Sequence, residues 1–424
     1  MNLGIFVMRR NYFKHFAGLI EHALARGDRV TLLCDHRGVN TPRRGPKAYE
    51  FPYLEEVPAF RNGTPRAAAF ASLDELARLV HEARLHVLFA QAENPVLEAL
   101  RLHPLAAGVL LAQLQCFPHP SIISAVHLFD VVYGFSAEWV QWSAEYVTHE
   151  RALTREEHDR YRKDLGAIFV PVGFAELEQL RFIDRATVRA RLGLPAGRPV
   201  VVYLPFPFAS VRHHRDFWPG RIYGRGRLLQ YASIALSGRT EYLPYPRNGW
   251  NDRRTAQSVR EFCDRNGALL VVKSRMKNPV PRYVRRLADR VFYDEAYYPA
   301  TILELLSAAD LCVHFYSGAL CEAAFAGVPN VCISPTPAEW PAYGRRMVVP
   351  ALSTAPGCLF NYPGVTWSLG VGEFIARFGR SRLAEFRLDR ARRHEFLRRY
   401  FAHVDVDVAA RIVADLRRRL GEET

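Results

Sequence analysis

The residues with the clearest potential for chemistry lie in the stretch TILELLSAADLCVHFYSGALCEAAFAGVP, residues 301–329. A helical spacing of apolar residues leads into an apolar run at 311–315, and small residues then allow a sharp turn into a second helix. The first amides of that helix lack helical partners and carry the positive end of its dipole, so they favour an anion such as a phosphate. The residues of this predicted phosphate turn are Tyr316, Ser317, Gly318 and Ala319.

Glu322 lies one turn into the second helix. A carboxylate at this place can accept hydrogen bonds from ribose hydroxyls, as acidic residues do in other nucleotide-binding α/β folds. The pattern therefore favours nucleotide binding. The alternative is an ordinary connection between a strand and a helix of a parallel sheet, in which Glu322 only stabilises the start of its helix.

The elements that would position this turn follow an alternation of strands and helices along most of the chain, which is typical of a doubly wound α/β sheet. In the first part we predict strands at 2–8, 30–34, 86–90, 122–126 and 131–134, and helices at 13–25, 73–83 and 95–102. Further strands are predicted at 200–204, 269–273, 290–293, 311–315 and 331–333. The alternation stops between the two sets, where a charged helix at 185–192 is followed by the punctuation residues GLPAG.

Two domains are the natural expectation for 424 residues with 49% hydrophobic composition. We predict a Rossmann-like N-terminal domain at 1–172, a connector at 173–199 and a second Rossmann-like domain at 200–372. An irregular insertion rich in basic and aromatic residues occupies 205–251, and such long insertions often carry function. Residues 373–424 are arginine-rich and helical, and long enough to lie across another domain.

Several functional classes find no support in the sequence. No G-x-G-x-x-G motif follows the first strand, so a nicotinamide or flavin cofactor is not expected. The seven cysteines are scattered without the paired spacing of a zinc or redox site, and buried thiols are expected. No segment has the length of a membrane-spanning helix and no signal peptide is recognisable, so we expect a cytoplasmic protein.

The formal net charge of +14 favours an anionic partner. A nucleotide-activated donor, a phosphorylated acceptor, an anionic membrane surface and nucleic acid all fit this charge. Much of the positive charge comes from arginine. The alternative to an anionic partner is therefore a compositional bias toward arginine that has no function. The arginine-rich C-terminal helices suit peripheral association with the inner face of a membrane, whereas no nucleic-acid recognition module is evident.

Five segments, taken in order, resemble GT-B glycosyltransferases, and the second half is similar to the CDP-glycerol glycerophosphotransferases that polymerise teichoic acids. The segments are VGFAELEQL, RARLGLPAGRPVVVYLP, LLVVKSRMKNP, YYPATILELLSAAD and YSGALCEAAFAGVP, which together cover about residues 170–335. The N-terminal RRNYFKHFAGLIEHALARGDRV also resembles the first strand, loop and helix of GT-B enzymes. Hydrolysing nucleotide-sugar 2-epimerases share that fold and a similar G-x-x-x-E-A-x-x-x-G-x-P stretch.

Two departures from the teichoic-acid pattern bear on the group transferred. The strand that ends in KSRMKNP lacks the His-Pro that often follows it in those enzymes, and FYSG stands where they have Asp-Tyr-Ser-Ser. Glycerophosphate transfer is therefore less well supported than sugar transfer.

The resemblance implies two domains that face each other across a cleft, with the donor on the second domain and the acceptor on the first. The C-terminal helices would cross back to the first domain. No DxD-like metal motif is evident, so cations of the protein are expected to stabilise the leaving phosphate and no metal is strictly required. Besides the phosphate turn, the candidate cations are Lys273, Arg275 and Arg212.

An inverting transfer needs a general base near the acceptor hydroxyl, and His15 is the best-placed histidine, beside Asn11 and Tyr12. Glu93 and His119 follow other predicted strands and are the remaining catalytic candidates, able to help hold the acceptor. For each, an ordinary surface or core role is the alternative.

The resemblance thus implies a glycosyltransferase that moves a sugar, or as second choice a polyol phosphate, from a nucleotide donor to a surface-glycan or lipid-linked acceptor. A hydrolysing UDP-sugar 2-epimerase is the alternative enzyme. A non-catalytic protein that binds nucleotides or polyanions is the alternative outside enzymes.

Overall fold

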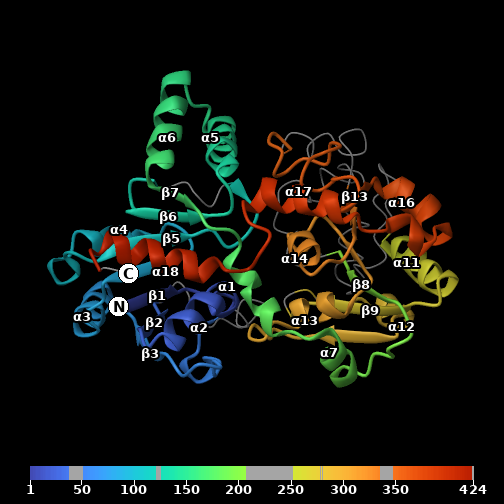
Figure 1. The fold of residues 1–424 in the computed structure, drawn as a ribbon, viewed down its shortest axis with the longest axis horizontal. Coiled ribbons are helices and arrows are strands. Elements are labelled where there is room, and N and C mark those ends of the chain that lie inside the picture. Colours follow the sequence, from blue (N-terminus) through green and yellow to red (C-terminus); the bar gives the residue numbers. More distant parts are fainter. Residues whose placement is uncertain are drawn as a thin grey trace, which may run out of the picture. The chain divides into compact units, whose positions relative to one another are not determined.

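The computed structural model describes residues 1–37, 51–120, 126–206, 252–276, 278, 280–334 and 347–422. The chain divides into two compact units, each built on a parallel sheet with helices on both faces (Figure 1). Unit 1 contains Met1–Phe182, Ala296–Ala300 and Leu397–Thr424, and unit 2 contains Ile183–Glu295 and Thr301–Phe396. The predicted fold class of two Rossmann-like α/β domains is confirmed.

The sheet of unit 1 has the strand order β3-β2-β1-β4-β5-β6-β7, and every described pairing in it is parallel. Its strands are β1 (Asn2–Val7), β2 (Arg29–Asp35), β3 (Arg66–Phe70), β4 (Val87–Ala90), β5 (Leu110–Leu114), β6 (Val131–Gly134) and β7 (Phe169–Pro171). Its helices are α1 (Tyr12–His15), α2 (Ala17–Ala25), α3 (Leu73–Glu82), α4 (Pro95–Arg101), α5 (Glu138–Arg151), α6 (Arg155–Ile168) and α18 (Val408–Arg419), with 3₁₀ segments η2 (Leu54–Glu56), η3 (Pro104–Ala106) and η5 (Ala175–Phe182).

Helices α1, α2 and α18 bury their apolar sides against one face of this sheet, and α3 and α4 cover the other. The short polar signals in the sequence set the helix ends. Ser72 caps α3 by accepting from the Glu75 N–H at 3.2 Å, and Asn94 caps α4 by accepting from the Val96 N–H at 3.0 Å. Helices α5 and α6 form a pair beside the β6 and β7 edge (Figure 1).

The sheet of unit 2 has the order β10-β9-β8-β11-β12-β13, again with parallel pairings among the described strands. Its strands are β8 (Val200–Leu204), β9 (Leu269–Ser274), β10 (Arg290–Tyr293), β11 (Leu311–His314), β12 (Asn330–Ile333) and β13 (Thr366–Leu369). Its helices are α7 (Arg185–Arg191), α11 (Asp252–Arg265), α12 (Arg282–Leu287), α13 (Thr301–Ala308), α14 (Ala319–Phe325) and α16 (Val371–Arg377), with η9 (Phe378–Arg380) and η10 (Leu383–Phe386). Helix α17 (Arg390–Phe401) spans the point at which the chain returns to unit 1.

One face of the second sheet packs against α11, α12 and α16, and the other packs against α7, α13 and α14. The chain enters unit 2 after Phe182, within the residues predicted as the connector, and leaves it after Phe396. Of the predicted insertion at 205–251, residues 207–251 lie outside the described residues, as do residues 122–125 of the predicted strand at 122–126.

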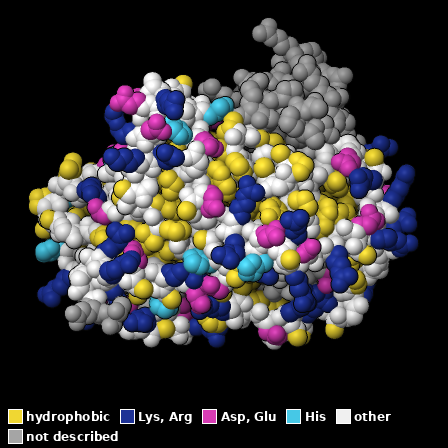
Figure 2. Space-filling view, turned by 45° about the horizontal axis from the view of Figure 1, so that its top comes forward, with side chains coloured by type: hydrophobic (Ala, Val, Ile, Leu, Met, Phe, Trp, Pro, Cys, Tyr) yellow, Lys and Arg dark blue, Asp and Glu magenta, His cyan; other side chains and the backbone are white. Residues whose placement is uncertain are grey.

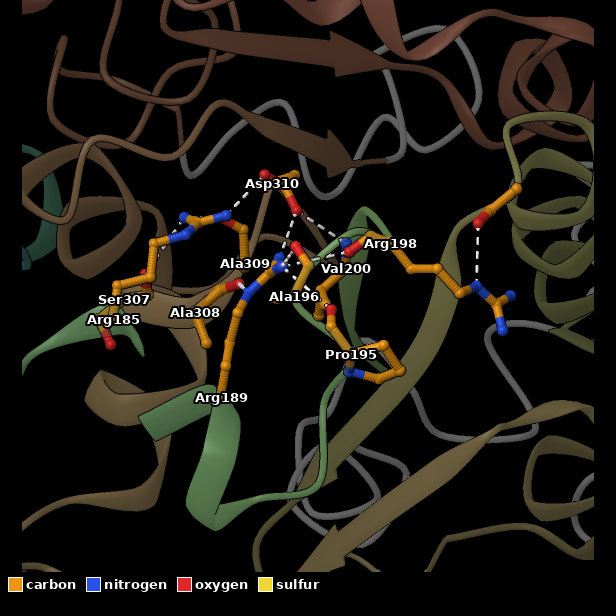
Figure 3. A network of polar contacts seen from close by, with 11 residues as sticks. Arg185, Arg189, Pro195, Ala196, Arg198, Val200, Ser307, Ala308, Ala309 and Asp310 are labelled. Carbon is orange, nitrogen blue, oxygen red and sulfur yellow. Dashed lines mark hydrogen bonds and ion pairs between the residues drawn. The ribbon is translucent and has the colours of Figure 1, made fainter. Parts of the chain in front are cut away.

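Asp310 fastens the start of β11 to the start of β8 in unit 2. Its backbone N–H donates to the Val200 carbonyl at 2.8 Å, and its carboxylate accepts from the Val200 N–H, also at 2.8 Å. The guanidinium of Arg189, which reaches up from α7, lies 2.8 Å from the same carboxylate and also donates to carbonyls around it (Figure 3). Those carbonyls belong to Pro195, Ala196, Arg198 and Ala308.

The same arrangement occurs at two other strand starts, once in each unit. In every case an aspartate directly precedes a strand, exchanges hydrogen bonds with one residue of the neighbouring strand, and pairs with an arginine from a helix. We call this arrangement the Asp–Arg clamp. Its other examples are Asp130 with Leu111 and Arg101, and Asp289 with Leu270 and Arg260.

Helix α18 is fixed in unit 1 by polar contacts as well as by its apolar face. The hydroxyl of Tyr133 in β6 donates to Asp415 at 2.8 Å. The carboxylate of Glu178 in η5 accepts from the Ala409 N–H in the first turn of α18. Burial raises the pKa of Glu178 to about 7, although the hydrogen bond from Ala409 and the charge of Arg181 oppose this shift.

We expect Glu178 to make unit 1 less stable as pH rises. Because its folded-state pKa of about 7 lies above the usual 4.5, the folded protein holds an extra proton between these values. The free energy of unfolding should therefore fall across this window relative to that of Glu178→Gln, by about 3 kcal/mol at most. Denaturant titrations at pH 5 and pH 7.5 check this, with the exposed Glu98→Gln as control. Parallel pH profiles of wild type and Glu178→Gln would contradict it.

Five residues between β10 and α13, Ala296–Ala300, belong to unit 1 although both flanking elements belong to unit 2. Tyr297 is part of the apolar core beneath the first sheet. The Tyr298 hydroxyl donates to Glu21, and its ring centroid lies 4.8 Å from that of Phe60. The Ala300 N–H donates to the Gln179 side chain at 3.0 Å.

Basic side chains are distributed widely over the face seen in Figure 2, with acidic side chains between them. Within the described parts of the chain, no helix combines the length and the apolar composition needed to span a bilayer.

Candidate functional site

The loop after β1 carries His15, the predicted general base. The predicted helix at 13–25 is divided at Phe16 into α1 and α2, and His15 is the last residue of the one-turn helix α1. Phe16 is fully buried and fixes this bend in the core. His15 therefore lies at the carboxyl edge of the sheet, where parallel α/β folds bind their ligands.

Both ring nitrogens of His15 have partners. Nδ1 faces the carboxylate of Glu176 in a short contact, and Nε2 lies 2.9 Å from the side-chain nitrogen of Asn11. Glu176 also forms an ion pair with Lys14. His15 is 8% exposed and Glu176 is 3% exposed, so this charged cluster is nearly closed to water.

A buried carboxylate beside a histidine fixes the ring orientation and the tautomer. The Nδ1–H of His15 donates to Glu176, so the lone pair of the ring lies on Nε2. The side-chain amide of Asn11 donates to this lone pair. The carboxylate also stabilises the imidazolium that forms when Nε2 takes up a proton. The pair can therefore act as a general base, provided that a substrate hydroxyl replaces Asn11 at Nε2.

Glu176 was missed as a site residue because it lies 161 positions from His15 in the chain. It stands in the segment VGFAELEQL, which carried part of the resemblance to GT-B enzymes. A signal was thus present, but nothing in the local pattern links this carboxylate to the histidine.

Glu93 follows β4, which is next to β1 in the sheet, and His119 follows β5, the strand after β4. All three catalytic candidates therefore come to the same sheet edge. Glu93 is exposed and its charge acts on Tyr161 of α6. The ring of His119 meets Tyr146 edge-on, with centroids 5.2 Å apart. Neither residue has a described contact with His15, and their catalytic roles stay predictions.

The predicted phosphate turn lies between β11 and α14 in unit 2, as the sequence pattern indicates. Two of its amides have partners within the protein: the Ser317 N–H donates to His314 Nδ1 at 3.1 Å, and the Ala319 N–H donates to Ser317 Oγ at 3.2 Å. No hydrogen bond of the Gly318 N–H is found among the described residues. An anion would therefore meet Gly318 first, and the other two amides only after their partners move.

Tyr316 turns inward from this loop. Its φ of +40° is in the left-handed region that non-glycine residues rarely adopt, and such strain often accompanies functional sites. The hydroxyl donates to the Leu352 carbonyl, and the ring stacks on Phe360 with centroids 3.8 Å apart. Tyr316 thus shapes the turn, and its predicted contact with a nucleotide stays untested.

Glu322 is 6% exposed, and its charge acts on the Cys312 thiol of β11. His314 is fully buried, and burial lowers its pKa to about 4. It stays neutral and holds the turn through Ser317, with its other nitrogen 3.3 Å from the Asn330 side chain. The role of Glu322 toward a ribose stays a prediction.

The two predicted cations at the end of β9 differ in burial. Lys273 is buried, which lowers its pKa, and its ammonium donates to the carbonyls of Ser274 at 3.1 Å and Asp294 at 2.9 Å and to the Asp294 carboxylate at 3.3 Å. A phosphate would have to replace one of these acceptors. Arg275 is partly exposed and pairs with Glu295 at 3.1 Å. The third predicted cation, Arg212, lies outside the described residues.

The described residues contain no group of three or more His, Cys, Asp or Glu side chains arranged to hold a metal ion. The candidate groups that the structure describes are thus the His15–Glu176 pair in unit 1 and, in unit 2, the Gly318 amide and the Arg275–Glu295 pair. No protein-family profile matches the chain. No curated protein matches it in sequence.

Solved structures match the chain along its whole length. UDP-GlcNAc 2-epimerase from Neisseria meningitidis, bound to UDP-GlcNAc, aligns with 99% of this chain and 99% of its own, with a TM-score of 0.53 and 12% identity. The 2-epimerase from Methanocaldococcus jannaschii gives a TM-score of 0.53 at 11% identity, covering 98% of this chain and 99% of its own. The wall teichoic acid polymerase TagF gives 0.53 at 10% identity, covering 100% of this chain and 89% of its own.

These likenesses are of fold, because the identities are low. They include both enzyme types that the sequence pattern resembles, the 2-epimerases and the teichoic-acid polymerases, and the predicted resemblance is confirmed at this level. The chain has the GT-B fold.

Proposed function

We propose that this protein is a metal-independent glycosyltransferase that moves a sugar from a nucleotide-activated donor to a surface-glycan or lipid-linked acceptor. The observation that carries the proposal is the buried contact between His15 and Glu176 at the carboxyl edge of the first sheet. An inverting transfer needs a base at this kind of place, oriented by a second group. A polyol phosphate is the second choice of transferred group.

In the proposed step, Nε2 of His15 takes the proton of the acceptor hydroxyl as the acceptor oxygen bonds to the anomeric carbon. The bond from that carbon to the phosphate oxygen breaks, and its electron pair leaves with the nucleotide. Glu176 stabilises the imidazolium. Within unit 2, the Gly318 amide and Arg275 are the groups that we propose to bind the phosphate of the nucleotide donor. The names of the solved neighbours, which include complexes with UDP and UDP-GlcNAc, support a nucleotide as the donor.

The first test is thermal unfolding with a panel of nucleotides and nucleotide sugars, and with heparin as a polyanion control. A ligand that binds the native state raises its stability by mass action. A selective shift with one nucleotide supports the donor site and identifies its base, whereas a response only to heparin would contradict the proposal. Conversion of a nucleotide sugar without any acceptor would favour the epimerase instead.

We expect Gly318→Val to weaken nucleotide binding at least tenfold, because the added side chain would keep a phosphate from the Gly318 amide. Gly318 has φ −57°, so valine fits the backbone and the fold should persist. Calorimetric titration with the nucleotide found in the panel checks this. Gly197→Val is the control, since a Cβ there meets no atom within 4 Å. Equal affinities of Gly318→Val and wild type would remove the turn from the donor site.

A further inference from the structure

Phe117 is an exposed aromatic residue beside the candidate base. It follows β5 at the carboxyl edge of the first sheet and is 40% exposed, which is unusual among the large apolar residues described. Its ring centroid lies 6.4 Å from that of His15. Phe117 therefore offers an apolar surface next to a polar cluster.

This ring is the outer end of a row of aromatic contacts that leads into the core. His15 is followed in the row by Tyr12, Phe16 and Phe89, with successive centroids 6.1–6.2 Å apart. Tyr12 is 6% exposed, and Phe16 and Phe89 are fully buried. The row fixes the inner side of His15 and leaves Phe117 as its exposed member.

The other sides of His15 are occupied. Glu176 faces Nδ1, Asn11 faces Nε2, and Tyr12 packs beside the ring. Phe117 is the exposed aromatic neighbour of the His15 ring, so it is the surface on which we expect the rest of a ligand bound at Nε2 to pack. Asn11 and Lys14 belong to the polar cluster at His15, with Asn11 at Nε2 and Lys14 paired with Glu176.

A pyranose ring matches such a surface. It has a face of C–H groups that packs on an aromatic ring, and a rim of hydroxyls that needs polar partners. An open-chain polyol phosphate has no such face, and its charge would favour guanidinium groups over a phenyl ring. We propose that Phe117 is the stacking platform for the terminal pyranose of the acceptor, with one hydroxyl of that sugar directed to His15. This inference rests on the proposed function and narrows its acceptor to a sugar-terminated one.

The test measures sugar binding directly, without turnover. Methyl β-glucopyranoside and methyl N-acetyl-β-glucosaminide are titrated into the full chain and followed by saturation-transfer and chemical-shift NMR, with glycerol 3-phosphate as the probe without a ring. We expect upfield shifts on one face of a glycoside, weakening of its binding about three- to tenfold in Phe117→Ala, and retention in Phe117→Tyr. Phe182→Ala is the matched control, because Phe182 belongs to the same unit and is 48% exposed.

Absence of glycoside binding to the wild type would overturn the platform, as would equal binding to Phe117→Ala. The platform would also be overturned if glycerol 3-phosphate binds more tightly than the glycosides and this binding is lost in Phe117→Ala. That result would favour a polyol acceptor. If Phe117 responds only to nucleotides, the ring stacks a base and the inference fails. The nucleotide panel is independent of these titrations: a chain that binds glycosides at Phe117 but no nucleotide keeps the platform and loses the proposed transfer.

Discussion

His15→Ala is expected to lower turnover about 10²–10⁴-fold, the usual contribution of a positioned general base. Nucleotide affinity should change less than about twofold, since nucleotide binding is assigned to the other unit. Glu176→Gln should lower turnover in the same direction and less strongly, because an amide can still orient the ring but does not stabilise the imidazolium. Steady-state rates with the donor identified by thermal unfolding, together with calorimetric affinities, measure both effects.

The control for this prediction is His81→Ala, which removes an exposed histidine from α3 in the same unit. Its rate should equal that of the wild type. If His15→Ala retains full turnover while the nucleotide still binds, His15 is not the base. The pair with Glu176 is then a structural contact of the loop after β1.

The largest effect on stability is expected for Arg189→Met. Its side chain is 9% exposed and donates to five acceptors in the Asp–Arg clamp at Asp310 (Figure 3). Methionine keeps much of the volume but leaves the buried Ala308 carbonyl and the partly buried carbonyls and carboxylate without this donor. Asp310 is 31% exposed and keeps Arg185, so the main cost comes from the polar groups that lose the guanidinium. Leaving a buried polar group without its partner typically costs about 1–3 kcal/mol, and a decrease of about this size in the free energy of unfolding is expected.

Arg191→Met provides the matched comparison on the same helix. Arg191 pairs with Glu304 at 2.5 Å, but its side chain is 52% exposed. An exposed pair contributes only about 0–1 kcal/mol, so this variant should unfold almost as the wild type does. Similar denaturant midpoints for the two variants would show that the clamp does not depend on Arg189.

Local sequence patterns were sufficient for the elements with strong β-branched or helical periodicity. The predicted strands at 131–134, 200–204 and 290–293 coincide with β6, β8 and β10. The strands that were missed lack such residues or are very short. β3 reads RAAAF, β5 reads LLAQL and β7 has three residues, so only pairing with neighbouring strands reveals them. The strand β13 was also not predicted.

The candidate site was predictable only where one segment carries it. The turn at Ser317 and Gly318 could be located because strand, turn and helix are consecutive in the chain. The partner of His15 could not, since Glu176 reaches it through the fold. The burial of a side chain could not be predicted from the sequence either. Lys273 was predicted as a cation that binds phosphate, whereas in the structure its ammonium is buried and donates to Asp294.

The short segment Ala296–Ala300 determines how the gene can be divided. With it and α18, unit 1 is assembled from three separate stretches of the chain. A polypeptide ending at Phe182 would lack the Tyr297 side chain in its core and the apolar face of α18, including Ile412 and Leu416. It would also leave Glu178 without the helix that it caps. No single cut in the coding sequence therefore yields two self-sufficient halves, and insertions or fusions that preserve folding must respect all three stretches at once.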